Sequence, residues 1–192
     1  MATTQSTVTR TGSKPITADE LLEMHARGIR GELIRGVLSP TMPAGMRHGE
    51  IVAKLTYLLG ATVIPNKLGT LTASDSGVRL STNPDTVREP DIAYFSAERL
   101  PPDAIVDGYA EIPPDLVVEV VSPSDSASAV NDKATMWTAF GVRLVWVLWP
   151  DTGMIEVFRP GEPVITLNEN DTLDGMDALP GFSCPVREVF RQ

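Results

Sequence analysis

The sequence contains a single cysteine, Cys184, in 192 residues. A lone cysteine excludes an intramolecular disulfide and a zinc site built from cysteines. It is compatible with a reducing compartment, and we predict a cytoplasmic location. The neighbours of Cys184, which include Phe182 and Pro185, indicate a packed structural thiol.

The sequence also lacks long apolar segments. No run approaches the roughly 20 residues that a membrane helix needs, and the polar segment Met1–Lys14 has no apolar stretch of the kind found in signal peptides. With 42% hydrophobic residues, the chain can bury one substantial core. We therefore expect residues 1–15 to form a flexible tail, residues 16–192 to form a single domain, and the protein not to associate with membranes.

Basic residues are few. The net charge is −9, which argues against strong non-specific binding of nucleic acid, because phosphate affinity comes largely from Lys and Arg. Residues 1–54 nevertheless carry seven Lys and Arg against five Asp and Glu. If a polyanion binds, we expect the N-terminal third to contact it, although ordinary solubility charge explains each single residue equally well.

Helical signals occur in three places. A capping box at Thr17–Glu20 begins a short helix that we expect to end near Gly28. Apolar positions at helical spacing predict a second helix over about Arg47–Leu59. A third apolar stripe runs from Val130 to Phe140 and ends at Gly141.

The remaining apolar segments have the composition of strands. We expect Leu71–Ser74 and Val78–Ser81 to form a hairpin, and the segment from Leu116 to Trp149 to form one βαβ unit with a right-handed crossover. The predicted strands are Glu32–Ile34, Val37–Leu38, Leu71–Ser74, Val78–Ser81, Ile92–Phe95, Leu116–Val121, Leu144–Trp149 and Met154–Phe158.

One predicted strand contains an acidic residue near its middle. Glu119 lies in Asp115–Pro123, a segment rich in β-branched residues and typical of a strand buried on both faces. An unpaired buried carboxylate costs several kcal/mol, so Glu119 must be paired, protonated, at an exposed strand end or bound to a cation. Simple alternation could also direct it to solvent.

Two further residues favour a reactive site. Asp91 follows Pro90 at the start of a strand, where it can meet Glu119, and Lys133 lies on the edge of the third helix stripe, from where its ammonium can reach the sheet. A lone lysine at that place is usually a solubilising flank. Beside two carboxylates it suggests hydrolysis of phosphodiester bonds with Mg²⁺, which needs few protein oxygen ligands.

These segments together resemble a known family. Pro90-Asp91, PPDLVVEVVSPS with Glu119, a helical Lys133 and GVRLVWVLWPDTGMIEVFRP are similar to the Uma family, a branch of the PD-(D/E)XK restriction-endonuclease-like superfamily. The resemblance covers roughly residues 16–160. It implies an α/β (α+β) fold in which a mixed β-sheet is flanked by helices, and a DNA endonuclease that uses Mg²⁺, with Mn²⁺ as a substitute.

The resemblance also implies the site residues. Asp91 and Glu119 correspond to the two acids of the motif and would bind the metal, together with the backbone carbonyl of Val120. The motif lysine should stand two residues after Glu119, but that position is Val121. In the Uma branch the lysine is moved to the following helix, which points to Lys133. Glu32 matches a frequent acidic position and is a further catalytic candidate.

Other possibilities remain open at the level of sequence. His48, before the second helix, is a weaker site candidate, because a histidine near a loop is more often an ordinary surface group. The fold could also serve as an inactive module that binds nucleic acid or assembles with protein, which the acidic charge balance favours. The apolar hairpin Leu144–Phe158 could pair with itself, and cleavage of both DNA strands needs two sites, so we predict a homodimer.

Overall fold

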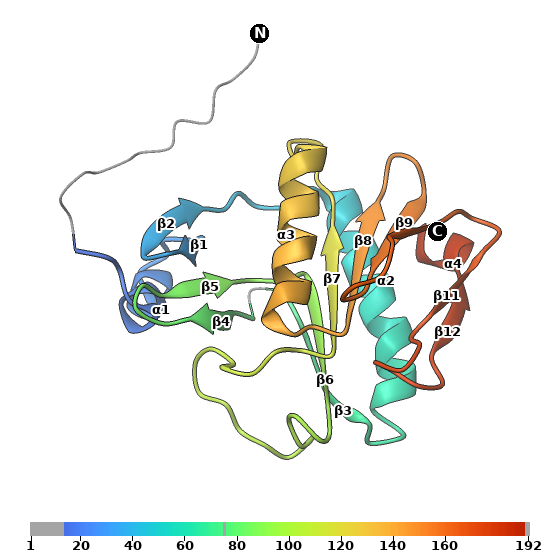
Figure 1. Ribbon diagram of the computed structural model, residues 1–192, viewed down its shortest axis with the longest axis horizontal. Coiled ribbons are helices and arrows are strands. Elements are labelled where there is room, and N and C mark those ends of the chain that lie inside the picture. The colour runs from blue at the N-terminus through green and yellow to red at the C-terminus, as the bar shows by residue number, and fades with distance from the viewer. Residues whose placement is uncertain (1–13, 75, 191–192) are drawn as a thin grey trace, which may run out of the picture.

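A computed structural model of the protein describes residues 14–74 and 76–190. The elements within them are α1 (Ala18–Ala26), β1 (Gly31–Ile34), β2 (Val37–Pro40), α2 (Met46–Val63), β3 (Gly69–Ala73), β4 (Val78–Ser81), β5 (Thr86–Arg88), β6 (Ile92–Ser96), β7 (Leu116–Val120), α3 (Ala127–Phe140), β8 (Leu144–Trp149), β9 (Met154–Phe158), β10 (Ile165–Leu167), β11 (Thr172–Asp174), β12 (Ser183–Pro185) and α4 (Val186–Phe190). Figure 1 shows their arrangement.

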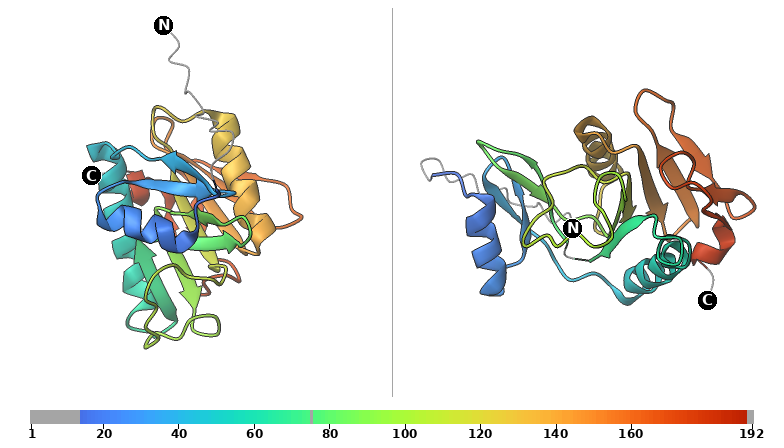
Figure 2. Two further views of the ribbon diagram at one scale, coloured as in Figure 1. Left: turned by 90° about the vertical axis from the view of Figure 1, so that its left-hand side faces the viewer. Right: turned by 90° about the horizontal axis from the view of Figure 1, so that it is seen from below.

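The large sheet has six strands in the order β10-β9-β8-β7-β6-β3. β7 and β8 are parallel and joined by α3, and the other neighbours are antiparallel. Figure 2 shows in its right panel that α2 and α3 lie on opposite faces of this sheet. Because both faces are covered, the strands of the predicted βαβ unit are almost continuously apolar.

Alternation along β7 divides its side chains between the two helices. Leu116, Val118 and Val120 pack in the core that α2 covers. Val117 and Val121 pack in the core that α3 covers. Since successive side chains point to opposite faces, Glu119 lies on the α3 face.

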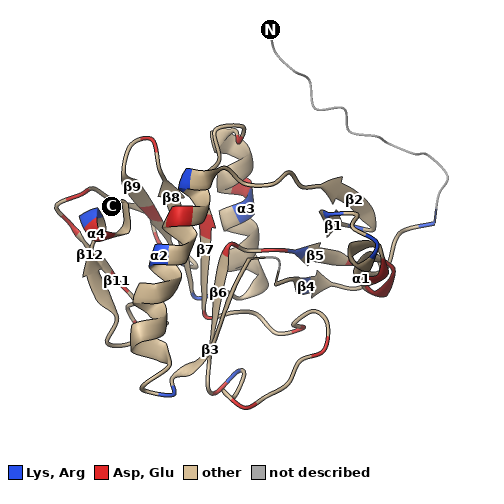
Figure 3. Ribbon diagram, turned by 180° about the vertical axis from the view of Figure 1, so that it is seen from behind, with Lys and Arg blue, Asp and Glu red and all other residues tan. Residues whose placement is uncertain are grey.

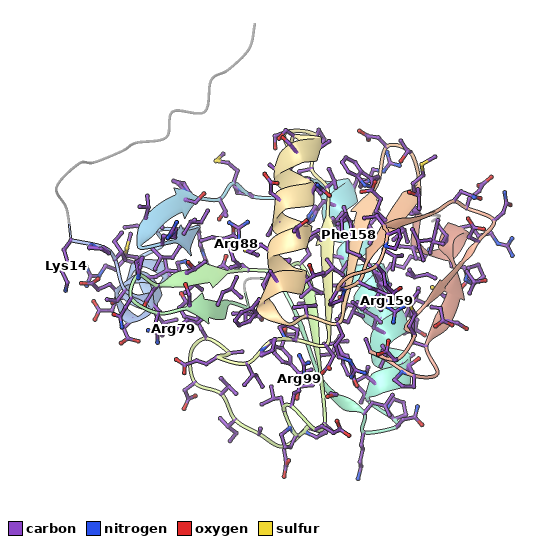
Figure 4. All side chains as sticks on the ribbon, viewed as in Figure 1. Lys14, Arg79, Arg88, Arg99, Phe158 and Arg159 are labelled. Carbon is purple, nitrogen blue, oxygen red and sulfur yellow. The ribbon has the colours of Figure 1, made fainter. Side chains whose placement is uncertain are left out.

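The small sheet has four antiparallel strands in the order β2-β1-β5-β4. Leu33 and Val87 pair across β1 and β5 and are buried against Leu21 of α1. The side chains that alternate with them, Glu32 and Arg88, therefore point away from α1. Figure 4 shows Arg88 on the side of the small sheet that faces α3.

The C-terminal segment completes the α2 side of the molecule. β11 and β12 form a two-stranded sheet, and Leu173, Cys184 and Val189 join the core beneath α2. Cys184 is buried and unbonded, as the sequence predicted. Burial, with a smaller contribution from the charge of Glu188, raises the pKa of its thiol to about 11.

Most of the predicted elements are confirmed. The capping box at Thr17 begins α1, and Gly141 ends α3 in the left-handed conformation. The second helix is longer than predicted and extends to Val63, because its apolar face continues along the sheet. None of the helices in the described ranges is long and apolar enough to cross a membrane. The predicted tail lies, apart from Lys14 and Pro15, outside the described residues, and the single-domain organisation stays a prediction.

Two predictions about strand pairing are wrong. Leu71–Ser74 and Val78–Ser81 do not form a hairpin, because β3 pairs with β6 in the large sheet and β4 pairs with β5 in the small one. The intervening segment, whose Asp75 lies outside the described residues, carries the chain from one sheet to the other. The hairpin Leu144–Phe158 itself is confirmed, because β8 and β9 pair antiparallel. Its use as a surface that pairs with a second copy is wrong, since β8 lies between β7 and β9, and β9 between β8 and β10.

Candidate active site

Glu119 is the centre of a buried cluster of charges. Glu119 is only 8% exposed, and each of its carboxylate oxygens accepts a hydrogen bond from a side chain of α3. Lys133 Nζ donates to Oε2 over 2.8 Å, and the indole Nε1 of Trp137 donates to Oε1 over 2.7 Å. The pKa of Glu119 is raised to about 7, chiefly by burial; Lys133 lowers it, and the charges of Asp91 and Glu32 add to the rise.

Lys133 is held in place by the helix that carries it. α3 begins where the Ser126 hydroxyl accepts the N–H of Ala129, and it packs on the sheet through Ala134 and Trp137, both fully buried. Lys133 lies one turn before Trp137 and so on the same face. Burial alone would lower its pKa, but the charges of Glu119 and Glu32 outweigh burial and raise it. The ammonium is therefore charged in its site.

Lys133 also joins the two sheets. Its Nζ lies 3.4 Å from Oε1 of Glu32, which belongs to β1 of the small sheet. Glu32 accepts the N–H of Glu89 over 2.9 Å and forms an ion pair with Arg88 over 3.0 Å. Lys133 thus reaches Glu119, as predicted, and also Glu32. Its side chain is 22% exposed and holds two ion pairs, so the alternative of a freely solvated flank does not describe it.

Asp91 stands immediately before β6 on the neighbouring strand. The register Ile92↔Val118, extended by one residue, brings Asp91 opposite Glu119. Oδ2 of Asp91 accepts the N–H of Val120 over 2.6 Å. The two motif acids thus occupy adjacent strands at the same end of the sheet, and the charge of Asp91 contributes to the raised pKa of Glu119.

His48 lies in the first turn of α2 and not before the helix, as was predicted. It belongs to this site and is not an ordinary surface group. Its Nε2 lies 3.2 Å from Oδ2 of Asp91, and its side chain is 13% exposed. The pKa of His48 is raised, and the largest cause is its hydrogen bond to Asp91. Burial lowers this pKa, whereas the charge of Asp91, a hydrogen bond to the Val120 backbone and the charge of Glu119 raise it. The imidazole therefore lies beside the same carboxylate and backbone group that were predicted to bind metal.

The donor set fits a weakly held hard cation. In residues 14–74 and 76–190, no three side chains of His, Cys, Asp or Glu are arranged to hold a metal ion. A closed cage of the zinc type is therefore not what these residues form. Mg²⁺ usually keeps several waters and takes one or two carboxylates. Asp91 and Glu119, two carboxylates on adjacent strands, fit that pattern.

Comparison with known proteins gives the family and the fold. The model of the Uma2 family, described as "Putative restriction endonuclease", matches residues 18–187. This chain belongs to the Uma2 family. A crystal structure of a putative nuclease belonging to DUF820 from Anabaena variabilis ATCC 29413 has the same fold, with a TM-score of 0.78 and 22% sequence identity over 92% of this chain and 98% of that one. No curated protein matches.

Membership of the Uma2 family confirms the resemblance seen in the sequence, and the mixed sheet flanked by helices confirms the predicted fold class. The Pro-Asp pair of the motif occurs five times in the chain, and the structure shows which aspartate meets Glu119. Asp85 accepts the N–H of Ala18 at the start of α1, and the fully buried Asp115 pairs with Arg99 and Arg143. Both therefore have structural partners, and Asp91 is the aspartate that meets Glu119.

Sequence reasoning missed two members of this candidate site. Trp137 was assigned to the helix stripe, and its indole N–H was not considered, although its spacing of four residues from Lys133 carried that signal. Arg88, the partner of Glu32, was not singled out because β5 itself was not predicted. A three-residue strand carries too little periodicity to be detected.

Proposed function

We propose that this protein is a divalent-metal-dependent endonuclease that hydrolyses phosphodiester bonds in DNA, with Mg²⁺ as its cofactor and Mn²⁺ as a substitute. The observation that carries the proposal is the contact of Lys133 with Glu119. The motif position for the lysine holds Val121, yet an ammonium still lies 2.8 Å from the second motif acid. A lysine from a helix thus restores the acid–lysine pair of the motif.

Each residue has a distinct role in the proposed reaction. Asp91 and Glu119, with the Val120 carbonyl, would hold the cation, which supplies polarisation of the phosphate and an acidified water when bound. Lys133 has three N–H donors, and its two carboxylate partners leave one for a phosphate oxygen or the attacking water. That donor would stabilise the charge that develops in the transition state.

The remaining residues of the site hold Lys133 and balance charge. Glu32 is tied to Arg88 and to the Glu89 N–H, so it serves as a fixed second partner for the ammonium. His48 supplies positive charge next to Asp91, and a cation bound there would replace that charge. We therefore expect metal binding to compete with a proton on His48.

Charge distribution affects how a nucleic acid would bind. Figure 3 shows that Lys and Arg of the described residues are scattered over the ribbon and do not form one stripe. With a net charge of −9, the protein would rely on the metal and a few cationic groups to approach phosphates. The same acidity favours the second candidate, an inactive module of the same fold that binds nucleic acid or protein.

Cleavage assays on matched variants separate these functions. Wild type, Asp91→Asn and Lys133→Met are incubated with duplex DNA, single-stranded DNA and RNA in Mg²⁺, in Mn²⁺ and in chelator. The proposal predicts metal-dependent cleavage of DNA by the wild type alone. Binding without cleavage of any substrate by the wild type would favour the inactive module.

We also propose that the protein acts as a homodimer, because cutting both strands of a duplex requires two sites. The hairpin β8–β9 cannot serve as the contact, since it is enclosed in the sheet. The edge strand β10 offers a different surface, on which Val164 and Ile165 are nearly half exposed. Sedimentation at micromolar concentration tests this, and a monomer throughout would contradict it.

A further inference from the structure

Trp137 makes a polar contact that its burial does not require. The indole is fully buried under α3, and its Nε1 donates to Oε1 of Glu119 over 2.7 Å. An indole N–H donates only, in one fixed direction, and buried Trp side chains usually find an acceptor. At this position the acceptor is the acid at the centre of the candidate site.

The other two tryptophans show that this choice of acceptor is specific. Trp146 is equally buried and packs against Phe182, but its Nε1 meets no acceptor in the part of the chain that the structure describes. Trp149 donates to Glu156 over 2.9 Å in a half-buried setting. This fold therefore tolerates a buried indole whose N–H has no protein partner, so packing alone does not explain the contact between Trp137 and Glu119.

The geometry of α3 fixes both oxygens of Glu119 at once. Lys133 and Trp137 are four residues apart on one helix face, and each donates to a different oxygen of the same carboxylate. With Oε1 held by the indole, the carboxylate cannot rotate away when Lys133 turns toward a substrate. Each oxygen keeps a second lone pair, so the acid can still bind a cation.

We infer that Trp137 is a positioning residue that holds Glu119 in the orientation needed to bind the metal ion. The inference rests on the proposed function, because it gives Glu119 the role of a metal ligand. Residues that orient ligands in this way typically change metal affinity or activity by about 10–100-fold when they are replaced. Trp137 would thus act through Glu119, without touching substrate.

The test compares Trp137→Phe with Trp146→Phe. Both variants replace a fully buried indole by a smaller ring, so both create a similar cavity, but only the first removes a donor to Glu119. Calorimetric titration with Mn²⁺ and with Mg²⁺ should give about 10–100-fold weaker binding for Trp137→Phe. Trp146→Phe should bind within about twofold of wild type, and melting curves report any loss of fold.

A second measurement does not depend on a variant that folds. In a ¹H–¹⁵N spectrum of the wild type, the indole signal of Trp137 should shift during metal titration with the midpoint found by calorimetry. The indole signal of Trp146, on the opposite face of the sheet, should stay in place. The two signals are assigned on the wild type by triple-resonance experiments.

The possible outcomes separate this inference from the proposed function. Metal binding by the wild type with unchanged affinity in Trp137→Phe, or with a stationary Trp137 indole signal, would overturn the inference and leave the proposed function standing. Absence of metal binding by the wild type would overturn the proposed function, and the inference with it. Weakened binding in Trp137→Phe alone, with a moving indole signal, supports both.

Discussion

Replacing Glu119 with Gln should change how the stability of the protein depends on pH. The variant substitutes an amide of the same shape for a carboxyl whose pKa burial raises from 4.5 to about 7. In the unfolded chain this carboxyl titrates near its ordinary value. Between pH 4.5 and about 7, Glu119 keeps its proton in the native state but has lost it in the unfolded state. Native stability therefore falls as the pH rises through this window.

The size of the effect follows from the two pKa values. A pKa difference of one unit is worth about 1.4 kcal/mol, so the change from 4.5 to about 7 corresponds to on the order of 3 kcal/mol. His48 contributes with the same sign, because its pKa is raised too: its stabilisation is fully present below 6.5 and is lost as the pH rises through its folded-state value. The Glu119→Gln variant and its parent should therefore both carry His48→Gln, which removes the titration of His48.

The assay is urea denaturation followed by circular dichroism at several pH values between about 5 and 8. The free energy of unfolding of the Glu119→Gln variant, minus that of its parent, should increase by on the order of 3 kcal/mol over this range. The ion pair with Lys133 forms only as Glu119 ionises, so its effect is already contained in the folded-state pKa of Glu119. Glu156→Gln is the matched control, because it makes the same substitution at a half-buried carboxylate that accepts the indole N–H of Trp149.

A difference that stays flat with pH would refute this reasoning. It would mean that Glu119 is ionised throughout the range and that Lys133 holds it as an ordinary ion pair. Saturating Mg²⁺ should also remove the slope in the parent protein, because a bound cation stabilises the ionised carboxylate.

Further predictions concern the site and its surroundings. Lys133→Met should lower single-turnover cleavage by about two orders of magnitude or more. It should also reduce the free energy of unfolding by about 3–5 kcal/mol, since it leaves two buried carboxylates without their shared partner. Adding Val121→Lys to the Lys133→Met variant should restore part of the cleavage, and no recovery would show that the two lysine positions do not serve the same site. Asp91→Asn should abolish Mg²⁺ binding in calorimetry, and unchanged binding would remove Asp91 from the site. Asp85→Asn should cost about 1–3 kcal/mol in urea denaturation, because Asp85 holds the start of α1, but should leave cleavage per folded molecule unchanged. Cys184, buried and with a pKa raised to about 11, should react with a thiol reagent far more slowly in the native protein than in urea, and equal rates would contradict its burial.

The parts of the fold that sequence could predict are those with local causes. The capping box at Thr17, the left-handed Gly141 and the apolar stripe of α3 are each encoded within a few residues. The βαβ unit followed from a change of period between neighbouring segments. The partners of β3 and β4 could not be predicted in this way, because local turn residues suggested a hairpin while burial in two separate sheets decided the pairing.

The contacts of the candidate site also differ in how far the sequence could predict them. The meeting of Asp91 and Glu119 could be expected from adjacent strands, and the position of Lys133 from the family resemblance. The contact between Lys133 and Glu32 could not, because it joins two sheets whose relative placement depends on the whole fold. The contact of His48 with Asp91 has the same origin, since the two residues lie on a helix and a strand far apart in the sequence.

The bridge formed by Lys133 has a consequence for the cooperativity of folding. Glu32 and Glu119 come from different sheets, and their charges disfavour each other until an ammonium lies between them. One ammonium on α3 thus balances an acid from each sheet. Docking of α3 and closure of the small sheet against the large one are therefore energetically coupled through Lys133.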